Sequence, residues 1–196
     1  MFWTELWLSE NMVRNSYDIH KTLWKMFPGQ SKREFLYTVT ERQRGQGARV
    51  LLQSQESPCL AECGPSITVL RQPKSLAGIV LQPGQILRFR LVANPTKKIR
   101  DAAQQERAIR VPHVGQHHQI AWLTRKLDGI GRVVYAEAQE TEPIHFSKSG
   151  QRGKVQPVCF TGVLEVLDGD AFRDMLNRGI GPAKSFGCGL MQLAPP

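Results

Sequence analysis

The chain has 196 residues, enough for one large domain or for two domains of about 90 to 100 residues each. Its 41% hydrophobic and 22% charged residues exclude a disordered chain, and no stretch approaches the roughly 18 consecutive apolar residues that a membrane-spanning helix needs. The 26 Lys and Arg against 17 Asp and Glu give a net charge of +9, which favours a nucleic-acid partner, because neutralising a phosphate releases counterions.

The first half of the chain predicts one helix among four short strands. The helix is expected over residues 17–27, because apolar residues recur there at helical spacing between Ser16, a suitable N-cap, and Pro28-Gly29, which ends it. The strand segments are short and apolar or alternate, and a glycine turn at 44–47 joins the second to the third. These strands are expected over 2–8, 34–40, 49–53 and 67–70.

The second half predicts two helices among strands. Residues 94–112 are polar and too charged to form a core, whereas 117–127 carry their apolar residues on one helical stripe. Asp168 or Asp170 can cap a second helix, which ends at Gly179. Strands are expected over 86–93, 132–137, 155–167 and 189–193, with a basic turn over 147–154.

Both halves therefore follow the order strand, helix, strand, strand, helix, strand, with residues 57–66 as a degraded second helix in the first half. We expect an α+β protein of two tandem ferredoxin-like (RRM-like, βαββαβ) domains, the first over residues 1–83 and the second over 84–196. This architecture presents an antiparallel sheet and basic loops, a surface often used to bind RNA. The fold alone does not decide the chemistry.

A glycine-rich run between Gly179 and Gly189 holds four glycines in eleven residues. Such a backbone can turn sharply and approach a phosphate closely, and Lys184 and Ser185 add a cation and a hydroxyl. It is not a P-loop, because Ala183 precedes the lysine and a short strand follows in place of a helix. A tight helix-to-strand connection that needs small residues is the structural alternative, and both interpretations can hold together.

His20 is the strongest candidate for acid–base chemistry. It lies three residues after Tyr17 in the first expected helix, so the imidazole and the phenol share one face and can point at the same phosphate. Imidazole titrates near neutral pH, which suits proton transfer. A structural role for a lone helical histidine is the alternative. The remaining histidines lack a convincing partner: His113, His117, His118 and His145.

The sequence predicts neither a metal site nor a cofactor. Cys59 and Cys63 are four residues apart, but no second close pair completes a tetrahedral zinc set. Paired carboxylates, a nucleophile elbow and the converging acids of a two-metal nuclease are also missing. The start MFWTELWLSE lacks the basic head of a signal peptide, so the cysteines are expected as free thiols in the cytoplasm.

Two basic segments complete the pattern. Residues 97–110 hold five cations and two acids, a net +3, and residues 148–154 hold three cations and no acid. A charge run is often only a solvated face, but basic segments together with a glycine-rich loop are better explained by a polyanion. An anionic membrane is the other polyanionic surface, and no long basic amphipathic helix supports it. The candidate contacts are Lys97, Lys98, Arg100, Lys148, Arg152 and Lys154.

Six motifs follow one another along nearly the whole chain. They are Tyr17-x-x-His20-x-x-Leu23-Trp24-x-x-Phe27-Pro28, Val50-Leu-Leu-Gln-Ser54, Phe89-Arg-Leu-x-Ala93-Asn-Pro95, Gln119-Ile-Ala-Trp-Leu123-x-Arg-Lys-Leu127, Val158-Cys-Phe-x-Gly-Val-Leu164 and Gly179-Ile-Gly-Pro-Ala-Lys-Ser-Phe-Gly-Cys-Gly189. Together they resemble the CasE family, the repeat-processing endoribonucleases of type I-E CRISPR systems. The glycine-rich segment is the most specific of the six.

The resemblance implies tandem ferredoxin-like domains and cleavage of CRISPR precursor RNA, without metal, on the 3′ side of the repeat stem-loop. The RNA's own 2′-hydroxyl would be the nucleophile, leaving a 5′-hydroxyl and a 2′,3′-cyclic phosphate. His20 falls on the family's catalytic histidine, as general acid or base. Tyr17 falls on its helix neighbour, which would orient or stabilise the phosphate.

The resemblance also implies that the protein stays on the product hairpin and becomes a subunit of the Cascade complex. The basic turn over 148–154 would lie along the stem, where A-form RNA is read mostly through shape and backbone. The family's glycine-rich loop, close to the RNA and to the domain packing, falls on Gly179, Gly181, Lys184, Ser185, Gly187 and Gly189.

Two other classes of function stay open. One is an RNA-binding module that never cuts, for which removing His20 would leave every RNA phenotype unchanged. The other is a structural subunit of a ribonucleoprotein whose basic loops only hold RNA. The sequence leaves open which repeat is recognised, and which Lys or Arg would stabilise the transition state.

Overall fold

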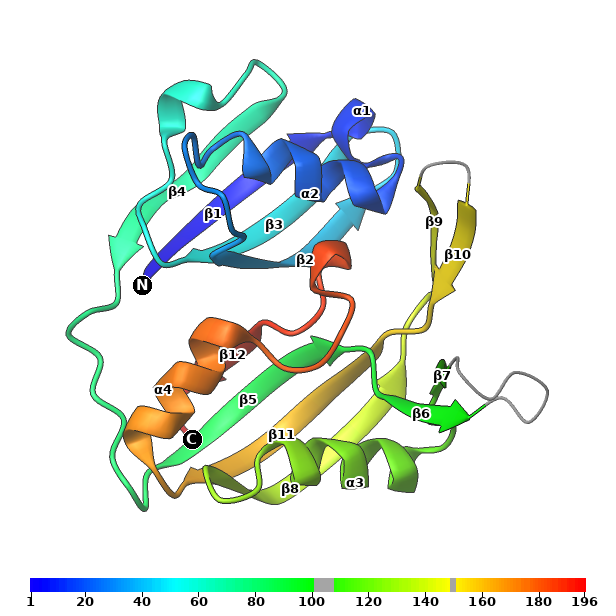
Figure 1. Ribbon diagram of the computed structural model, residues 1–196. Helices are drawn as coiled ribbons and strands as arrows, with labels where there is room; N and C mark the ends of the chain where they lie inside the picture. The colour runs from blue at the N-terminus through cyan, green and yellow to red at the C-terminus, as the bar shows by residue number, and fades with distance from the viewer. Residues whose placement is uncertain (101–107, 149–150) are drawn as a thin grey trace.

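The protein folds into two α+β domains, each built on a four-stranded antiparallel sheet with helices on one face (Figure 1). The structure, a computed structural model, describes residues 1–100, 108–148 and 151–196. Within these ranges the side chains of Arg100, Ala108, Ser147, Lys148, Gln151 and Arg152 are not described. No helix in the described ranges is both long and apolar enough to cross a membrane.

The first domain has its strands in the spatial order β2-β3-β1-β4. This is the order of a ferredoxin-like unit, with a short 3₁₀ turn in the place of its second helix. The elements are β1 (Phe2–Ser9), α1 (Glu10–Val13), α2 (Ser16–Trp24), β2 (Phe35–Gln43), β3 (Gly47–Ser54), η1 (Leu60–Glu62) and β4 (Ile67–Ser75).

The core of the first domain lies between its sheet and α2. Leu6 and Leu8 alternate along β1 toward the helix, and Ile19 and Leu23 of α2 meet them, all at most 1% exposed. Burying an aliphatic side chain of this kind stabilises the fold by about 1.5–3 kcal/mol. The expected N-cap was off by one residue, because the Asn15 side chain accepts from the Tyr17 amide and caps α2 in place of Ser16.

The second domain has its strands in the order β12-β5-β11-β8, which is again the ferredoxin-like order. Two hairpins extend from this sheet, β6–β7 and β9–β10 (Figure 1). The elements are β5 (Ile86–Ala93), β6 (Thr96–Arg100), β7 (Ala108–Pro112), α3 (Gln116–Lys126), β8 (Gly131–Glu140), β9 (Ile144–Lys148), β10 (Gln151–Val155), β11 (Val158–Val166), α4 (Gly169–Arg178), η2 (Lys184–Phe186) and β12 (Met191–Ala194).

The second core lies between the sheet and helices α3 and α4. Trp122 of α3 stacks on Phe160 of β11, with ring centroids 6.1 Å apart. Asp168 caps α4 by accepting from the Ala171 amide at 2.9 Å, and Gly179 ends that helix with φ +72°. Of the two expected caps, Asp168 and Asp170, the structure shows the first, and it confirms the expected helix end at Gly179.

Several elements differ from expectation in their bounds or their number. The first helix ends at Trp24, three residues before the expected 27. The single strand expected over 155–167 is divided, because Val155 closes β10 while β11 begins at Val158. Residues 94–112, for which only a polar segment outside the core was expected, include the strands β6 and β7.

The two domains meet across the helix-free face of the first sheet. Leu36 and Leu51 of that face pack on Leu190 of the second domain, and all three are at most 4% exposed. Beside them, the Gln53 amide donates to the carbonyl of Leu176 in α4 at 2.8 Å. We propose that the boundary lies between residues 83 and 84, in the connection from β4 to β5.

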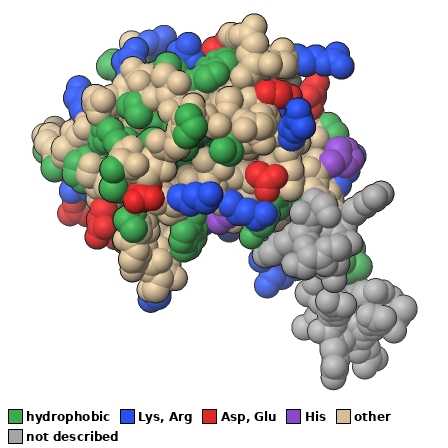
Figure 2. Space-filling model, turned by 90° about the horizontal axis from the view of Figure 1, so that it is seen from above, with side chains coloured by type: hydrophobic (Ala, Val, Ile, Leu, Met, Phe, Trp, Pro, Cys, Tyr) green, Lys and Arg blue, Asp and Glu red, His purple; other side chains and the backbone are tan. Residues whose placement is uncertain are grey.

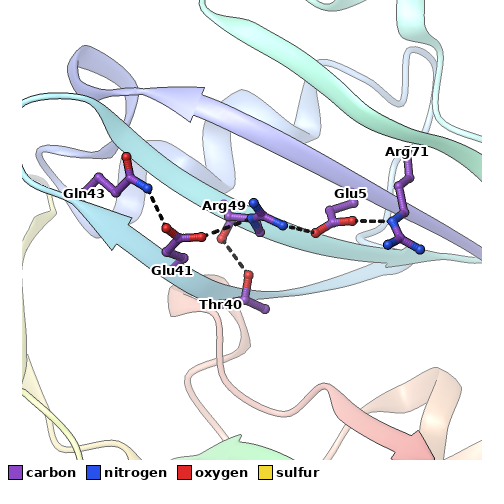
Figure 3. Close-up of polar contacts among 6 residues, drawn as sticks. All are labelled: Glu5, Thr40, Glu41, Gln43, Arg49 and Arg71. Carbon is purple, nitrogen blue, oxygen red and sulfur yellow. Dashed lines mark hydrogen bonds and ion pairs between the residues drawn. The ribbon is translucent and has the colours of Figure 1, made fainter.

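The rest of this sheet face carries a charged network (Figure 3). Glu5, 15% exposed, is paired with Arg49 at 3.1 Å and with Arg71 at 2.8 Å. Arg49 is also paired with Glu41 at 3.2 Å. Exposed ion pairs are worth only about 0.2–1 kcal/mol each, so this network keeps the face polar more than it stabilises the fold.

Candidate functional site

Tyr17 and His20 lie side by side on α2, as their spacing predicted. Their ring centroids are 5.8 Å apart, and the planes are tilted by 42°. The imidazole is only 9% exposed, because it packs against Trp24 at 5.5 Å and Phe35 at 5.6 Å. The surrounding rings hold the imidazole in one orientation, which a group that transfers protons at a fixed atom requires.

The glycine-rich run between α4 and β12 packs against both domains. A side chain at Gly179 would place its Cβ 2.7 Å from the Leu36 side chain, and one at Gly187 would be 3.2 Å from the Tyr37 ring. Both glycines also have left-handed φ angles, +72° and +82°. At Gly181, φ +79°, a Cβ would lie 2.9 Å from Trp122. These contacts give the run a structural reason for its glycines, so its expected approach to a phosphate stays a separate prediction.

The loop is hydrogen-bonded to the first domain at Ser185. The phenol of Tyr37, which is 1% exposed, donates to the Ser185 carbonyl at 2.7 Å. Burial raises the pKa of Tyr37 far above its ordinary value, so the phenol stays a neutral donor. Arg33 adds a long contact of 3.5 Å from its guanidinium to the Ser185 hydroxyl.

A line of aromatic rings runs from the Tyr17–His20 pair to the β9–β10 hairpin. Phe186, next to Ser185, lies 6.0 Å from Tyr17, and Phe146 of β9 lies 4.5 Å from Phe186. Phe146 covers Gly153 of β10 so closely that a Cβ there would be 2.3 Å from the ring. Through these ring contacts the glycine-rich loop lies between the helix of His20 and the middle of the basic hairpin.

The residues expected to bind RNA belong to three separate segments of the second domain, which are β6, the β9–β10 hairpin and the glycine-rich loop. Lys184 is half-buried in the loop, and Lys154 is exposed on β10. Lys97 and Lys98 are exposed on β6, in the other hairpin of the second domain. On the face drawn in Figure 2, Lys and Arg side chains are interspersed with Asp and Glu. The side chains of Arg100, Lys148 and Arg152 lie outside the described residues.

Four residues at the site were missed by the sequence analysis: Arg33, Tyr37, Phe146 and Phe186. Their partners lie far along the chain, as for Tyr37 and Ser185, which are 148 positions apart, so no local pattern signals them. Arg33 follows a glycine-containing turn, so the local sequence predicts only a solvent-exposed cation. The packing of the two domains brings Arg33 and Tyr37 to the loop, whereas Phe146 reaches it from the β9–β10 hairpin of the same domain and Phe186 is part of the loop.

The cysteines and histidines form no metal-binding cluster within the described ranges. No three side chains among His, Cys, Asp and Glu come together there in a way that could hold a metal ion. Cys59 and Cys63 are free thiols, and burial raises the pKa of Cys63 above its ordinary value. The rings of His117 and His118 contact each other edge to face at 5.5 Å.

Comparison with known proteins gives one consistent result. The family model described as "CRISPR associated protein" matches residues 4–195. The "CRISPR system Cascade subunit CasE" of Escherichia coli K12 is 38% identical over 203 aligned residues, covering 100% of both chains. The crystal structure of the CRISPR-associated protein Cas6e from E. coli K-12 superposes with a TM-score of 0.86, at 39% identity and full coverage of both chains.

A second relative, from Thermus thermophilus, extends the comparison. The "CRISPR-associated endoribonuclease Cse3" of that organism is 34% identical over 200 residues, covering 93% of this chain and 92% of the relative. A structure of T. thermophilus Cse3, bound to an RNA representing a pre-cleavage complex, has a TM-score of 0.80 at 29% identity over 99% of each chain. The similarity spans both domains, so the tandem ferredoxin-like fold is shared along the whole chain.

Proposed function

Because the chain belongs to the family of CRISPR-associated proteins that includes these relatives, we propose that it is an endoribonuclease for CRISPR precursor RNA. It cuts at the 3′ base of the repeat stem-loop, needs no metal ion, and remains bound to the hairpin of the mature guide RNA. The observation that carries this proposal is the pair formed by Tyr17 and His20, with ring centroids 5.8 Å apart at the loop of the second domain.

The proposed reaction uses the substrate's own 2′-hydroxyl as nucleophile. The hydroxyl loses its proton and its oxygen attacks the adjacent phosphorus, while the bond from phosphorus to the 5′-oxygen breaks and that oxygen gains a proton. The products are a 2′,3′-cyclic phosphate and a 5′-hydroxyl. The protein must supply a group that accepts or donates a proton and donors for the charge that builds on the phosphate.

His20 fits the proton-transfer role, because an imidazole can accept from the 2′-hydroxyl or donate to the leaving oxygen near neutral pH. Tyr17 fits the donor role, because its phenol shares the helix face of His20. The Lys21 ammonium lies 5.2 Å above the Tyr17 ring and adds positive charge there, although it is also paired with Asp18 at 3.1 Å.

Hairpin binding would then use the β9–β10 hairpin and the glycine-rich loop. Lys154 is exposed on β10, and the ring contacts from Phe146 through Phe186 to Tyr17 set this hairpin beside α2. A-form RNA is recognised mainly through its shape and backbone, which suits a positively charged hairpin against a stem. By analogy with the E. coli relative, named a Cascade subunit, we propose that the protein joins a Cascade complex while it holds the hairpin.

A cleavage assay on an end-labelled CRISPR-repeat hairpin in EDTA, with wild type and His20→Ala, tests the proposal. The wild type should cut once at the base of the stem, and the variant should bind with unchanged affinity and not cut. The burial of His20 among aromatic rings favours the alternative of an RNA-binding module with a structural histidine. Binding of the hairpin by the wild type without cutting would support that alternative. Cutting that needs added magnesium would overturn the mechanism.

A further inference from the structure

A second feature at the domain junction points to an anion. A cavity of about 370 Å³ opens where the start of β2 meets the end of α4. The first domain contributes Arg33, and the second contributes Arg178 and Lys184. The cavity therefore exists only when the two domains are docked, and three of its lining residues are cations.

These three cations are not neutralised by acidic side chains. Across the described ranges, no carboxylate lies within 4.0 Å of a nitrogen of Arg33, Arg178 or Lys184. Burial lowers the pKa of Lys184, and the nearby charges of Arg33 and Arg178 lower it further. Glu34 also lines the cavity, but its side chain is exposed to solvent and forms no such pair.

Backbone carbonyls at the end of α4 offset part of the positive charge of these three cations. The Lys184 ammonium donates to the Arg178 carbonyl, and the Arg178 guanidinium donates to the Asp174 carbonyl at 3.3 Å. A helix C-terminus, however, carries only about half a negative charge, which one cation is enough to offset. Arg33 remains, with a buried Nε that has no hydrogen-bond partner among the described residues.

We propose that this cavity holds one phosphate group of the RNA backbone, adjacent along the RNA strand to the reacting phosphate that the proposed function places at His20. The assignment rests on the proposed endoribonuclease function. Guanidinium groups bind phosphate through paired, charge-assisted hydrogen bonds, and a phosphate between the three cations would remove their mutual repulsion.

The loop makes a backbone phosphate the fitting anion. Three consecutive residues, Lys184, Ser185 and Phe186, lead from the cavity to Tyr17, because the first lines the cavity and the last lies 6.0 Å from the Tyr17 ring. Arg33 also contacts the Ser185 hydroxyl, at 3.5 Å. An RNA strand whose reacting phosphate lies at Tyr17 and His20 therefore meets these cations as it continues.

The first test measures binding of a repeat hairpin that cannot be cut, because its reacting nucleotide lacks the 2′-hydroxyl. Arg33→Gln should bind it about tenfold more weakly, and the slope of log affinity against log salt should fall by about 0.7–0.9, as for one lost phosphate contact. The matched control is Lys126→Gln, an exposed cation in the last turn of α3, which should keep the wild-type affinity and slope within error. Equal behaviour of Arg33→Gln and Lys126→Gln would overturn the proposal.

The second test locates the phosphate. A neutral methylphosphonate is placed singly at each linkage on either side of the cut. One position should weaken wild-type binding about as much as Arg33→Gln does, and that position should have no further effect in Arg33→Gln. If every position weakens both proteins equally, the cavity does not hold an RNA phosphate.

The third test separates an RNA phosphate from a free one, and also checks folding. Inorganic phosphate, compared with chloride at equal ionic strength, should raise the Tm of the wild type and not that of Arg33→Gln. A rise in Tm without any sensitive linkage would assign the cavity to free phosphate and overturn the RNA assignment. Cleavage of an ordinary hairpin by the wild type is scored separately. A failure of the endoribonuclease function is thus distinguished from a failure of this inference.

Discussion

The phenol of Tyr37 contacts the backbone of two segments that lie far apart in the sequence. It donates to the Ser185 carbonyl at 2.7 Å, and it lies 3.5 Å from the Ser16 carbonyl. Ser16 begins the helix that carries Tyr17 and His20, and Ser185 belongs to the glycine-rich loop. One buried side chain therefore contacts both the loop and the helix of the proposed catalytic pair.

Removing this hydroxyl should loosen the junction. Tyr37→Phe leaves the buried Ser185 carbonyl without its donor, which should lower the free energy of unfolding by about 1–3 kcal/mol. Urea unfolding followed by fluorescence measures the loss. Tyr135→Phe is the control, because that ring is 55% exposed and its loss of a hydroxyl should matter by less than about 0.5 kcal/mol. Equal stability of the two variants would show that the 2.7 Å bond does not stabilise the junction.

Removing the phenol hydroxyl of Tyr17 should slow the chemistry without weakening binding. Tyr17→Phe keeps the ring packed against His20 and Phe186 and deletes only the donor. Loss of one donor to the charged transition state typically costs about 10²–10³ in rate. Single-turnover cleavage at saturating protein gives the rate, and a hairpin that cannot be cut gives the affinity. A variant that cuts at the wild-type rate would restrict Tyr17 to a packing role.

The glycine at the end of α4 should not tolerate a methyl group. Gly179→Ala places a Cβ 2.7 Å from Leu36 and keeps a φ of +72° that L-residues disfavour, so we expect a loss of about 2–4 kcal/mol in urea unfolding. Gly78→Ala is the matched control, since nothing lies within 4 Å of its Cβ position and its φ is not left-handed. That control should be neutral or stabilising by up to about 1 kcal/mol. Parallel losses in both variants would contradict the packing across the junction.

Alkaline pH should destabilise the fold through Cys188. Burial raises the pKa of this thiol to about 12 from an ordinary 9.0, so between these values the unfolded chain has lost a proton that the folded protein keeps. The free energy of unfolding should therefore be unaffected by this group below pH 9 and fall above it, by up to about 1.4 kcal/mol for each pH unit. Urea unfolding of wild type and Cys188→Ala between about pH 7 and 10.5 tests this. The variant should show the shallower decline, and parallel curves throughout would refute it.

Lys154 should contribute to hairpin binding through charge. Lys154→Ala should weaken binding at low salt and reduce the salt slope by about 0.9, the value for one phosphate contact in a duplex. Lys126→Ala removes an equal charge from an exposed position on α3 and should leave the slope unchanged. Fluorescence anisotropy at several salt concentrations measures both. An unchanged slope for Lys154→Ala would place β10 away from the stem.

The elements with a buried face were predictable from the sequence. Residues 86–93 alternate because Leu87, Phe89 and Leu91 face a core, and the strand found there has those bounds. The hairpin strands β6 and β7 have no such face, since Ile99 and Ile109 are 40% and 48% exposed, so their pattern gave no signal. The helix α1 has only four residues, too few for a helical period to show.

The site was predictable only in its local part. Tyr17 and His20 are neighbours on one helix turn, and their spacing alone predicted that they share a face. The sequence predicted that the glycines form a tight connection, but it did not predict their contacts with the first domain. Leu36 and Tyr37, the side chains that Gly179 and Gly187 pack against, lie more than a hundred residues earlier. The place of Arg33 at the site could not be predicted for the same reason, because its neighbours Lys184 and Arg178 belong to the other domain.

The contacts of Gly179 with Leu36 and of Gly187 with Tyr37 also constrain how such proteins can change. Each contact pairs a side chain of one domain with the backbone of a glycine in the other, so a larger residue at either glycine would require a smaller residue opposite it. A chimera that joined the first domain of one relative to the second domain of another would retain the helix of His20 and the glycine-rich loop. It would keep their alignment only where the side chains of the first domain fit the glycines of the second, so these positions are expected to change together.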